Sequence, residues 1–281
     1  MKKLKFVFVL LLLMVQLILP QEKQDKFQVD FKEIKGELTS KDLFKKDFGR
    51  YDGFEIELYE GEAVNFVAYS NNFQPSIALV NSKGDIFKQS LRNDKGFANI
   101  EAVIPSGGKW VLYLIGEENA KGSYTLHTAI AEPNSLLLNP NADFCTTLDF
   151  LLSHANAYFF LLDSPGLTKQ QLVKINDAVD AYIDEENGSY NATFYSDNDL
   201  AKAESVFLNV TDKIKVYLGK DWQIISKNWQ KIEDYKEKSI TFTERSKGKP
   251  RYVRITIHDY SAFKQNYENK ISVEIEINRK H

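Results

Sequence analysis

Apolar and polar residues alternate with a period of two through much of the first half of the chain. The pattern runs through residues 54–58 and returns over residues 64–68 after a Glu-Gly-Glu turn. This is the pattern of a β-strand with one face in water. Turn signals at residues 81–84 and 105–108 fit the spacing of about 8–12 residues that is typical of β-sandwiches. No helical period competes with this pattern.

Two later segments refine the expectation of a sandwich. Residues 110–115 are apolar on both faces, which predicts a central strand. In residues 123–130, Tyr124 and Leu126 are expected to point inward, while Thr125 and His127 point outward. We therefore predict that residues 26–131 form an all-β sandwich domain.

A family resemblance rests on short motifs in a fixed order. They are Gly36-Glu37-Leu38, Tyr51-Asp52-Gly53-Phe54, Pro75-Ser76-Ile77, Trp110-Val111-Leu112-Tyr113 and Gly122-Ser123-Tyr124. Their order and spacing over residues 30–131 resemble the bacterial pre-peptidase C-terminal domain, a β-sandwich appended to many secreted proteases and other exported proteins. The resemblance implies an accessory module that in some proteins binds calcium and in others a substrate or surface. Such modules usually follow a catalytic domain, whereas here the module comes first.

Calcium is the one metal that this resemblance suggests as a ligand. Asp52, Asp85 and Asp94 are the acidic loop residues nearest a plausible site. Calcium takes six to eight oxygen ligands, and the sequence has no D-x-D-x-D-G run. Solvated turn carboxylates are the alternative interpretation. We leave calcium open, assign no metal site and predict no other cofactor.

The first 21 residues indicate export. A basic start with Lys2, Lys3 and Lys5 precedes an apolar run over residues 6–19, which is short of the roughly 20 residues that span a bilayer. We interpret residues 1–21 as a signal peptide and keep an uncleaved anchor as the alternative, because no small-x-small cleavage motif is present. No later segment is expected to cross a membrane. The protein is thus expected in the periplasm, outside the cell or on its surface.

Residues 132–143 are predicted to be a linker, because two prolines with polar neighbours bracket three leucines. Beyond it the period changes. Asp143 is placed to cap a helix that runs toward His154, and Asp199 or Ser196 to cap a helix that Gly219 ends. Residues 157–162 are expected to be a strand, residues 168–182 a helix and residues 190–195 a strand.

Three strands are predicted to close the chain. They surround residues 240–243, 252–257 and 271–277, and each has one apolar and one polar face. An antiparallel sheet with helices on one face buries those apolar faces. Residues 144–281 are therefore predicted to form an α+β domain.

Charge argues against nucleic acid as a partner. Three of the 36 basic residues lie in the leader, so the rest of the chain carries a formal charge of −6. A nucleic-acid-binding protein needs a basic field.

The search for catalytic groups assigns no catalytic residue. A thiol–imidazole pair would need Cys145, the only cysteine, with His154 or His258 as the candidate partner. Cys145 opens an apolar helix, where a small buried hydrophobe is the simpler interpretation. His127 and His258 fall on polar strand faces and are expected to be solvated. The acidic residues 184–186 are expected to be a solvated helix end.

Aromatic residues are abundant in this sequence, and they are the residue type that best suits binding of a ligand or partner. Candidates are Tyr51, Tyr59, Tyr69, Phe73, Trp222 and Trp229. Exposed rings bind sugars or protein partners, whereas packing within the domains is the alternative. The sequence thus favours an exported, non-enzymatic binding or accessory protein of the bacterial cell envelope, whose sandwich module binds a protein or a glycan. A secreted hydrolase with its site in the α+β domain or the inter-domain cleft is the alternative, and a purely structural envelope subunit that associates with itself is a third interpretation.

Overall fold

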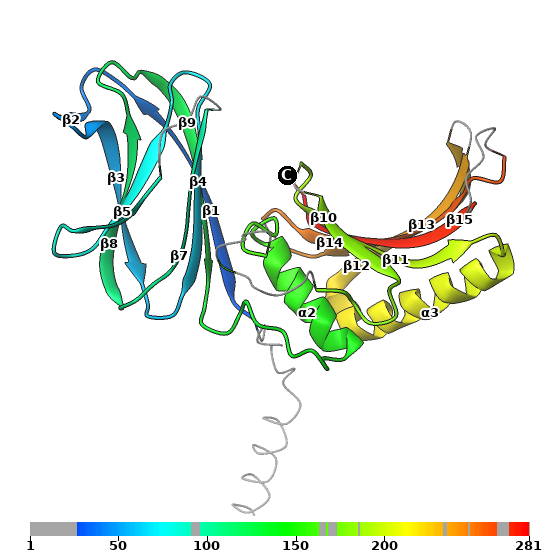
Figure 1. Cartoon of the computed structure of the whole chain (residues 1–281). Coiled ribbons are helices and arrows are strands. Elements are labelled where there is room, and N and C mark those ends of the chain that lie inside the picture. Colours follow the sequence, from blue (N-terminus) through cyan, green and yellow to red (C-terminus); the bar gives the residue numbers. More distant parts are fainter. Residues whose placement is uncertain are drawn as a thin grey trace, which may run out of the picture.

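The computed structural model describes residues 27–90, 96–162, 167, 173–184, 186–232, 235–246, 248–262 and 270–280. They form a stack of two sheets, followed by one broad curved sheet with two helices on one face (Figure 1). Every strand pair in the described part of the chain is antiparallel. The predicted fold class, a β-sandwich followed by an α+β domain, is confirmed.

The sandwich consists of β1 (Val29–Leu38), β2 (Leu43–Lys45), β3 (Gly49–Leu58), β4 (Ala63–Tyr69), β5 (Ser76–Val80), β6 (Ile86–Gln89), β7 (Phe97–Val103), β8 (Gly108–Gly116) and β9 (Gly122–Ala131). One sheet has the order β1-β9-β4-β7 and the other β2-β3-β8-β5-β6. The strand that is apolar on both faces, β8, lies at the centre of its sheet, as predicted. Tyr124 and Leu126 point into the core between the sheets, which is also as predicted.

Strand β4 is buried on both faces, for two different reasons. Val64, Phe66 and Ala68 belong to the sandwich core. On the opposite face, Ala63 packs in a second apolar cluster, and the Nδ2 atom of Asn65 donates a hydrogen bond to the carbonyl of Phe160, 2.9 Å away. The second face of β4 thus meets the chain segment that follows helix α2.

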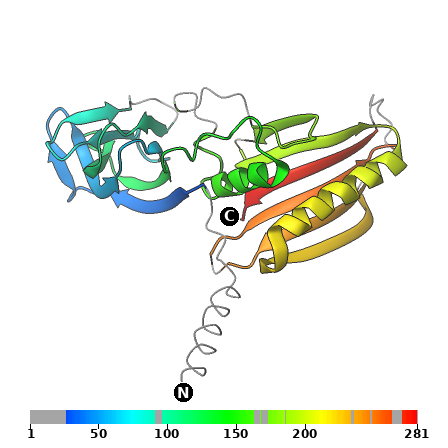
Figure 2. The same ribbon diagram turned by 90° about the horizontal axis from the view of Figure 1, so that it is seen from below.

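The α+β domain is built on a six-stranded sheet in the order β10-β11-β15-β14-β13-β12. Its strands are β10 (Asp180–Asp184), β11 (Ser189–Asp197), β12 (Trp222–Ile232), β13 (Tyr235–Glu244), β14 (Arg251–Asp259) and β15 (Ile271–Arg279). The apolar residues of β14 and β15 form one large core with both helices. Figure 2 shows the two helices on the same side of this sheet.

The two helices begin where the sequence places their caps. The Asp143 side chain accepts a hydrogen bond from the Thr146 backbone N–H at 2.7 Å, at the start of α2 (Phe144–Ala155). The Asp199 side chain accepts one from the Lys202 N–H at 3.0 Å, at the start of α3 (Leu200–Leu218). Gly219 ends α3 with a φ of 68°, a conformation that side chains disfavour. A short 3₁₀ turn, η1 (Gly219–Asp221), leads into β12.

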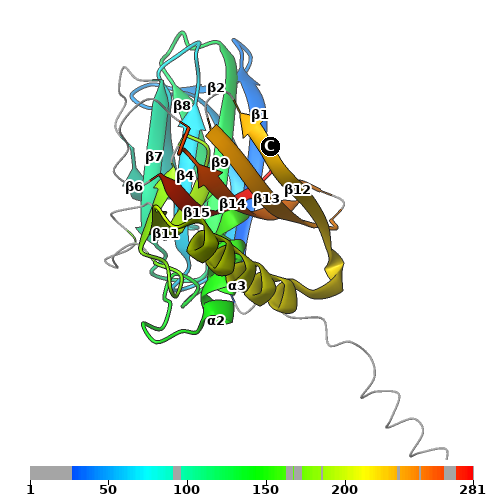
Figure 3. The same ribbon diagram turned by 90° about the vertical axis from the view of Figure 1, so that its right-hand side faces the viewer.

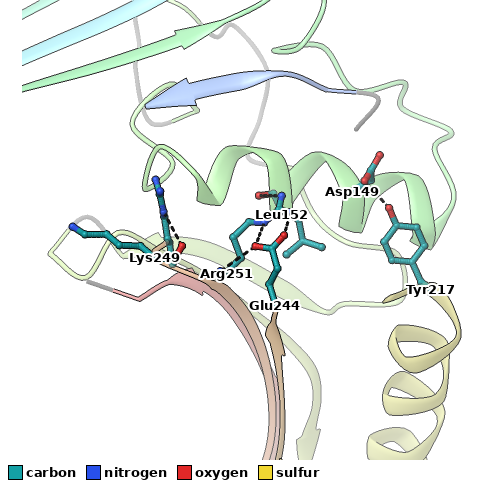
Figure 4. A network of polar contacts seen from close by, with 7 residues as sticks. Asp149, Leu152, Tyr217, Glu244, Lys249 and Arg251 are labelled. Atoms are coloured by element: carbon teal, nitrogen blue, oxygen red, sulfur yellow. Dashed lines mark hydrogen bonds and ion pairs between the residues drawn. The ribbon is translucent and has the colours of Figure 1, made fainter. Parts of the chain in front are cut away.

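A polar network holds α2 against the sheet (Figure 4). The Arg251 guanidinium donates two hydrogen bonds to the Glu244 carboxylate, at 2.6 and 3.0 Å, and a third to the Leu152 carbonyl at 3.3 Å. Burial raises the pKa of Glu244, but the bonds from Arg251 outweigh it and leave that pKa below its usual value. The Tyr217 hydroxyl donates to Asp149 at 2.6 Å and ties α3 to α2.

The segment between β9 and α2 is anchored at Ser135. Its hydroxyl accepts a hydrogen bond from the Gln28 N–H at 3.0 Å, and its carbonyl lies 2.8 Å from the Nε2 atom of His154. His154 is fully buried in α2 and contacts the ring of Phe150, with 4.5 Å between ring centroids. The start of the sandwich and the first helix of the next domain are thereby fixed to the same connector.

Several local predictions were wrong. Residues 157–162 form consecutive turns, with φ values of 49° and 60° at Tyr158 and Phe159, and not a strand. The predicted helix over residues 168–182 lies partly outside the described residues, but Tyr182 belongs to strand β10. Strand β12, which contains Trp222 and Trp229, was not predicted.

The predicted leader, residues 1–21, also lies outside the described residues. Among the residues that are described, no helix is both long enough and apolar enough to cross a membrane.

Candidate functional site

The free face of the six-stranded sheet is the candidate site. The helices cover one face, and the alternate residues of each strand point to the other face, which is concave in Figure 1. The register lines these residues up in rows across the strands. One row runs Asn191, Glu276, Arg254, Thr241, and the next runs Thr193, Glu274, Thr256, Ser239. The polar faces predicted for the closing strands therefore form one continuous surface.

This surface contains a hollow of about 270 Å³, here called the polar hollow. It is lined by Asn191, Lys227, Glu237, Ser239, Thr241, Arg254, Thr256, His258, Glu274, Ile275 and Glu276. The short side chains of Ser239, Thr241 and Thr256 stand in the middle, and longer charged side chains surround them. The depression therefore arises from side-chain length as well as from the curvature of the sheet.

Glu276 is held in place at one side of the polar hollow. The Tyr252 hydroxyl donates a hydrogen bond to its Oε1 atom at 2.5 Å, and Arg254 pairs with its Oε2 atom at 3.4 Å. The Arg254 guanidinium also lies 5.7 Å from the centroid of the Tyr252 ring. Burial, together with the hydrogen bond to Glu276, raises the pKa of Tyr252 far above its usual value. Tyr252 therefore stays a hydrogen-bond donor throughout the physiological range.

Glu274 and His258 form the second polar group. The Ser272 hydroxyl donates to Glu274 at 2.8 Å, and the Nε2 atom of His258 lies 3.8 Å from the other carboxylate oxygen. The Nδ1 atom of His258 is buried without a hydrogen-bond partner among the described residues. Glu237 lies directly across the strand pair from His258. His258 thus has one carboxylate near its Nε2 atom and a second directly across the strand pair.

Aromatic rings flank this end of the polar hollow. The ring centroids of Tyr235, His258 and Tyr260 lie 5.1–5.8 Å from one another. His258 stacks on Tyr260 with an interplanar angle of 22°. The site thus combines fixed charges and hydroxyl groups with an aromatic cluster at one end.

Of the residues that the sequence offered as catalytic candidates, only His258 lies in this site. The prediction that Cys145 is buried was wrong, because its side chain is exposed at the start of α2. His154, from the same helix, faces Ser135 instead. The thiol–imidazole pairing is therefore not formed with His154.

His127 lies on the sandwich, near the meeting of the two domains, with its ring 5.3 Å from Phe31 and 5.8 Å from Phe160. Burial lowers its pKa, although Glu33 acts in the opposite direction. The expectation that His127 and His258 are solvated was wrong, because 18% of each side chain is exposed. Their placement on polar strand faces was correct, but neighbouring rings cover them.

The acidic residues proposed for calcium do not form a cluster in the described structure. Asp52 accepts a hydrogen bond from the Tyr124 hydroxyl at 2.6 Å, and Asp85 closes a turn with Asn81. Asp94 lies outside the described residues, as does Glu185 of the 184–186 run. Within the part of the chain that is described, no three histidine, cysteine or acidic residues gather as a metal site would require. Asp184, which was expected at a helix end, ends strand β10.

The predicted aromatic candidates have different surroundings. Tyr51 packs edge-on against Phe48 and Tyr113 on the sandwich. Tyr59 and Tyr69 are exposed at strand ends, whereas Phe73 and Trp222 are buried. Trp229 packs partly into the core of the α+β domain. None of these residues lines the polar hollow, whose flanking rings, Tyr235 and Tyr260, were not predicted.

Comparisons with known proteins give only remote similarity. No family model matches the chain, and no curated protein matches it. Among solved structures, a periplasmic inhibitor of g-type lysozyme from Aeromonas hydrophila is 11% identical, covering 36% of this chain and 85% of that chain at a TM-score of 0.27. The pre-peptidase C-terminal domain of a Bacillus anthracis collagenase is 17% identical, covering 34% of this chain and 87% of that chain at a TM-score of 0.26. At this level the likeness concerns a β-sandwich-like fold alone and carries no argument about a ligand or an activity.

Proposed function

We propose that this chain is an exported, non-enzymatic binding protein of the bacterial cell envelope, and that it holds a glycan on the free face of its six-stranded sheet. The observation that carries the proposal is the polar hollow, with hydroxyl groups at its centre, charged groups around them and aromatic rings at one end. The proposal moves the binding face from the sandwich, where the sequence placed it, to the α+β domain.

The lining matches the chemistry of sugar hydroxyl groups, which both donate and accept hydrogen bonds. Carboxylates such as Glu274 accept, Arg254 and Lys227 donate, and the serine and threonine hydroxyls do both. Glu276 is already fixed by Tyr252 and Arg254, so less side-chain freedom is lost when a ligand binds there. Aromatic faces such as that of Tyr260 suit the apolar faces of sugar rings.

The size and charge of the polar hollow favour a glycan over a protein partner. Its 270 Å³ is close to the lower limit of ligand pockets, about 300 Å³, which suits one sugar residue of a longer chain. The core of a protein interface is depleted of charged residues, whereas this lining contains Lys227, Arg254 and three glutamates.

A hydrolase is the second candidate, because carboxylates and an imidazole meet in the same hollow. A glycosidase needs one carboxyl group that protonates the leaving group and a second that acts as nucleophile or base. Both carboxylate oxygens of Glu276 are already engaged, Oε1 by the Tyr252 hydroxyl and Oε2 by Arg254, so Glu276 is fixed as a hydrogen-bond acceptor. Binding therefore accounts for this arrangement more simply than catalysis does.

The test is a glycan array probed with residues 22–281, followed by calorimetric titration of the best oligosaccharide into the protein. Glu274→Gln and Arg254→Ala are expected to weaken binding at least about tenfold, because each removes a charged hydrogen-bonding group from the polar hollow. Glu55→Gln on the exposed outer face of β3 is the matched control.

Binding that survives both polar-hollow variants would refute this location. Release of reducing sugar during the titration would favour the hydrolase.

A further inference from the structure

The edges of the sheets differ in how they are protected against pairing with another chain. An exposed edge strand presents unpaired N–H and C=O groups. Strands β2, β6 and β10 are short, with three, four and five residues. Strand β1 carries lysines and glutamates along its length. Strand β7 is approached by Lys88, whose ammonium group donates to the Glu101 carbonyl. These five edges are short, charged or covered.

Strand β12 is different in its first half. It has 11 residues, and most of them are exposed. The second half is protected by Lys227 and Lys231 and by an irregular register between Lys227 and Gln230. From Trp222 to Ser226 there is no charge, proline or bulge. Ile224 and Ile225 point to opposite faces and are 43% and 47% exposed, so this stretch of edge is apolar on both sides.

The helices leave this margin of the sheet open. Helix α3 packs on β14, β15 and β11, and among the described strands β12 is the outermost at this margin of the sheet (Figure 3). An exposed apolar edge of this length is a site for strand pairing. The charges near it decide which partner fits.

A second copy of the same chain satisfies those charges. In an antiparallel pair, directly opposed residues lie on the same face, so a two-fold axis must pass through a residue position. An axis at Ile224 sets Ile224 against its own copy. It also brings Asp221, the last residue of η1 just before the strand, toward Lys227 of the other copy, and the symmetry makes this charge pair twice. An axis at Ile225 would instead set Asp221 against Trp229 and leave both charges unpaired. The register centred on Ile224 is therefore the complementary one.

We propose that β12 pairs with β12 of a second copy in this register, which joins the two six-stranded sheets into one. The two-fold axis then stands perpendicular to the sheet, so both free faces point the same way. The two polar hollows share one surface, which would let a long glycan engage both and bind more tightly than either hollow does alone. The dimer does not depend on that ligand.

The test is sedimentation equilibrium of residues 22–281 over a range of concentrations, without ligand. Pairing along a single strand buries little surface, so association is expected to be weak and reversible, with a mass that rises from monomer toward dimer. Ile224→Lys places two like charges opposite each other and is expected to lower the association constant at least about tenfold. Val216→Lys, on the exposed side of α3, is the matched control and is expected to change nothing.

A charge swap tests the register. Asp221→Lys and Lys227→Asp should each weaken association, and the double variant should restore it, which also shows that the altered strand still folds. A monomer at every concentration would overturn the proposal. So would association that is insensitive to Ile224→Lys, or a double variant that stays as weak as the single ones.

Discussion

Protonation of His154 should make the α+β domain less stable in mild acid. Its ring is fully buried, and its Nε2 atom donates to the Ser135 carbonyl at 2.8 Å. Its Nδ1 atom has no hydrogen-bond partner among the described residues. Burial lowers its pKa from 6.5 to about 4, although the bond to Ser135 acts in the opposite direction. Charging the ring would place a second N–H where no acceptor is available.

The direction and size of the effect follow from linkage. Between pH 6.5 and about 4 the unfolded chain binds a proton at His154 and the native chain does not, so stability falls as the pH falls. Relative to pH 7.5, the loss is about 2 kcal/mol at pH 5 and levels off near 3.4 kcal/mol below pH 4, at 1.36 kcal/mol per pKa unit.

The perturbation that isolates this contribution is His154→Gln, because the glutamine amide can still donate to Ser135 but does not titrate. Wild type and variant are unfolded with urea at pH 7.5, 6.5, 5.5 and 5.0. Trp222 and Trp229 report on the α+β domain, and a Trp110→Phe background removes the signal of the sandwich. The difference in unfolding free energy between the two proteins should shift by about 2 kcal/mol in favour of the variant from pH 7.5 to pH 5.

Other titrating groups, His127 included, are common to both proteins and cancel in this difference. Parallel pH curves for wild type and variant would refute the reasoning. That result would mean that His154 keeps an ordinary pKa in the native protein.

Three further changes test the fold. Asp199→Ala should lower stability by about 1 kcal/mol, because it removes the side-chain cap of α3; an unchanged urea midpoint would contradict the capping role. Ile255→Ala in the centre of β14 should cost about 2–5 kcal/mol, measured by urea unfolding, because its side chain is completely buried; a loss below 1 kcal/mol would show that the core closes around the gap. Gly122→Ala should destabilise the sandwich by at least about 1 kcal/mol, since φ is 124° and the new Cβ would lie 2.4 Å from Asn72; a stable variant, judged by its melting temperature, would mean that Asn72 moves aside.

The strands of the sandwich were largely predictable because each has one strongly apolar face. The alternation at β3 and the apolar run at β8 depend on neighbours close in sequence, and so do the caps at Asp143 and Asp199. The failures lie where long-range contacts decide the conformation. The apolar residues 157–162 have strand-like composition, but they turn between the domains, with Asn65 bonded to the Phe160 carbonyl. Strand β12 lacks alternation because most of its residues are exposed on both faces.

In the candidate site, too, local sequence predicted some features and long-range contacts decided the others. The alternation in β14 and β15 already put Arg254, Thr256, Glu274 and Glu276 on a polar face. It did not show that Glu276 faces Arg254 across the strand pair, or that Glu237 faces His258. Those pairings depend on the register, which is set by the way the apolar faces fit against α2 and α3.

By itself, the sequence determined the fold classes, most strand faces and both helix caps, because period, capping and turn chemistry act over a few residues. Only the tertiary structure decided that short hydroxyl side chains on β13 and β14 lie between charged ones to form the polar hollow. It also decided that the first half of β12 forms an unprotected edge and that His154 is buried against Ser135. Each of these depends on which distant strands and segments become neighbours, and the packing of the whole chain sets that order.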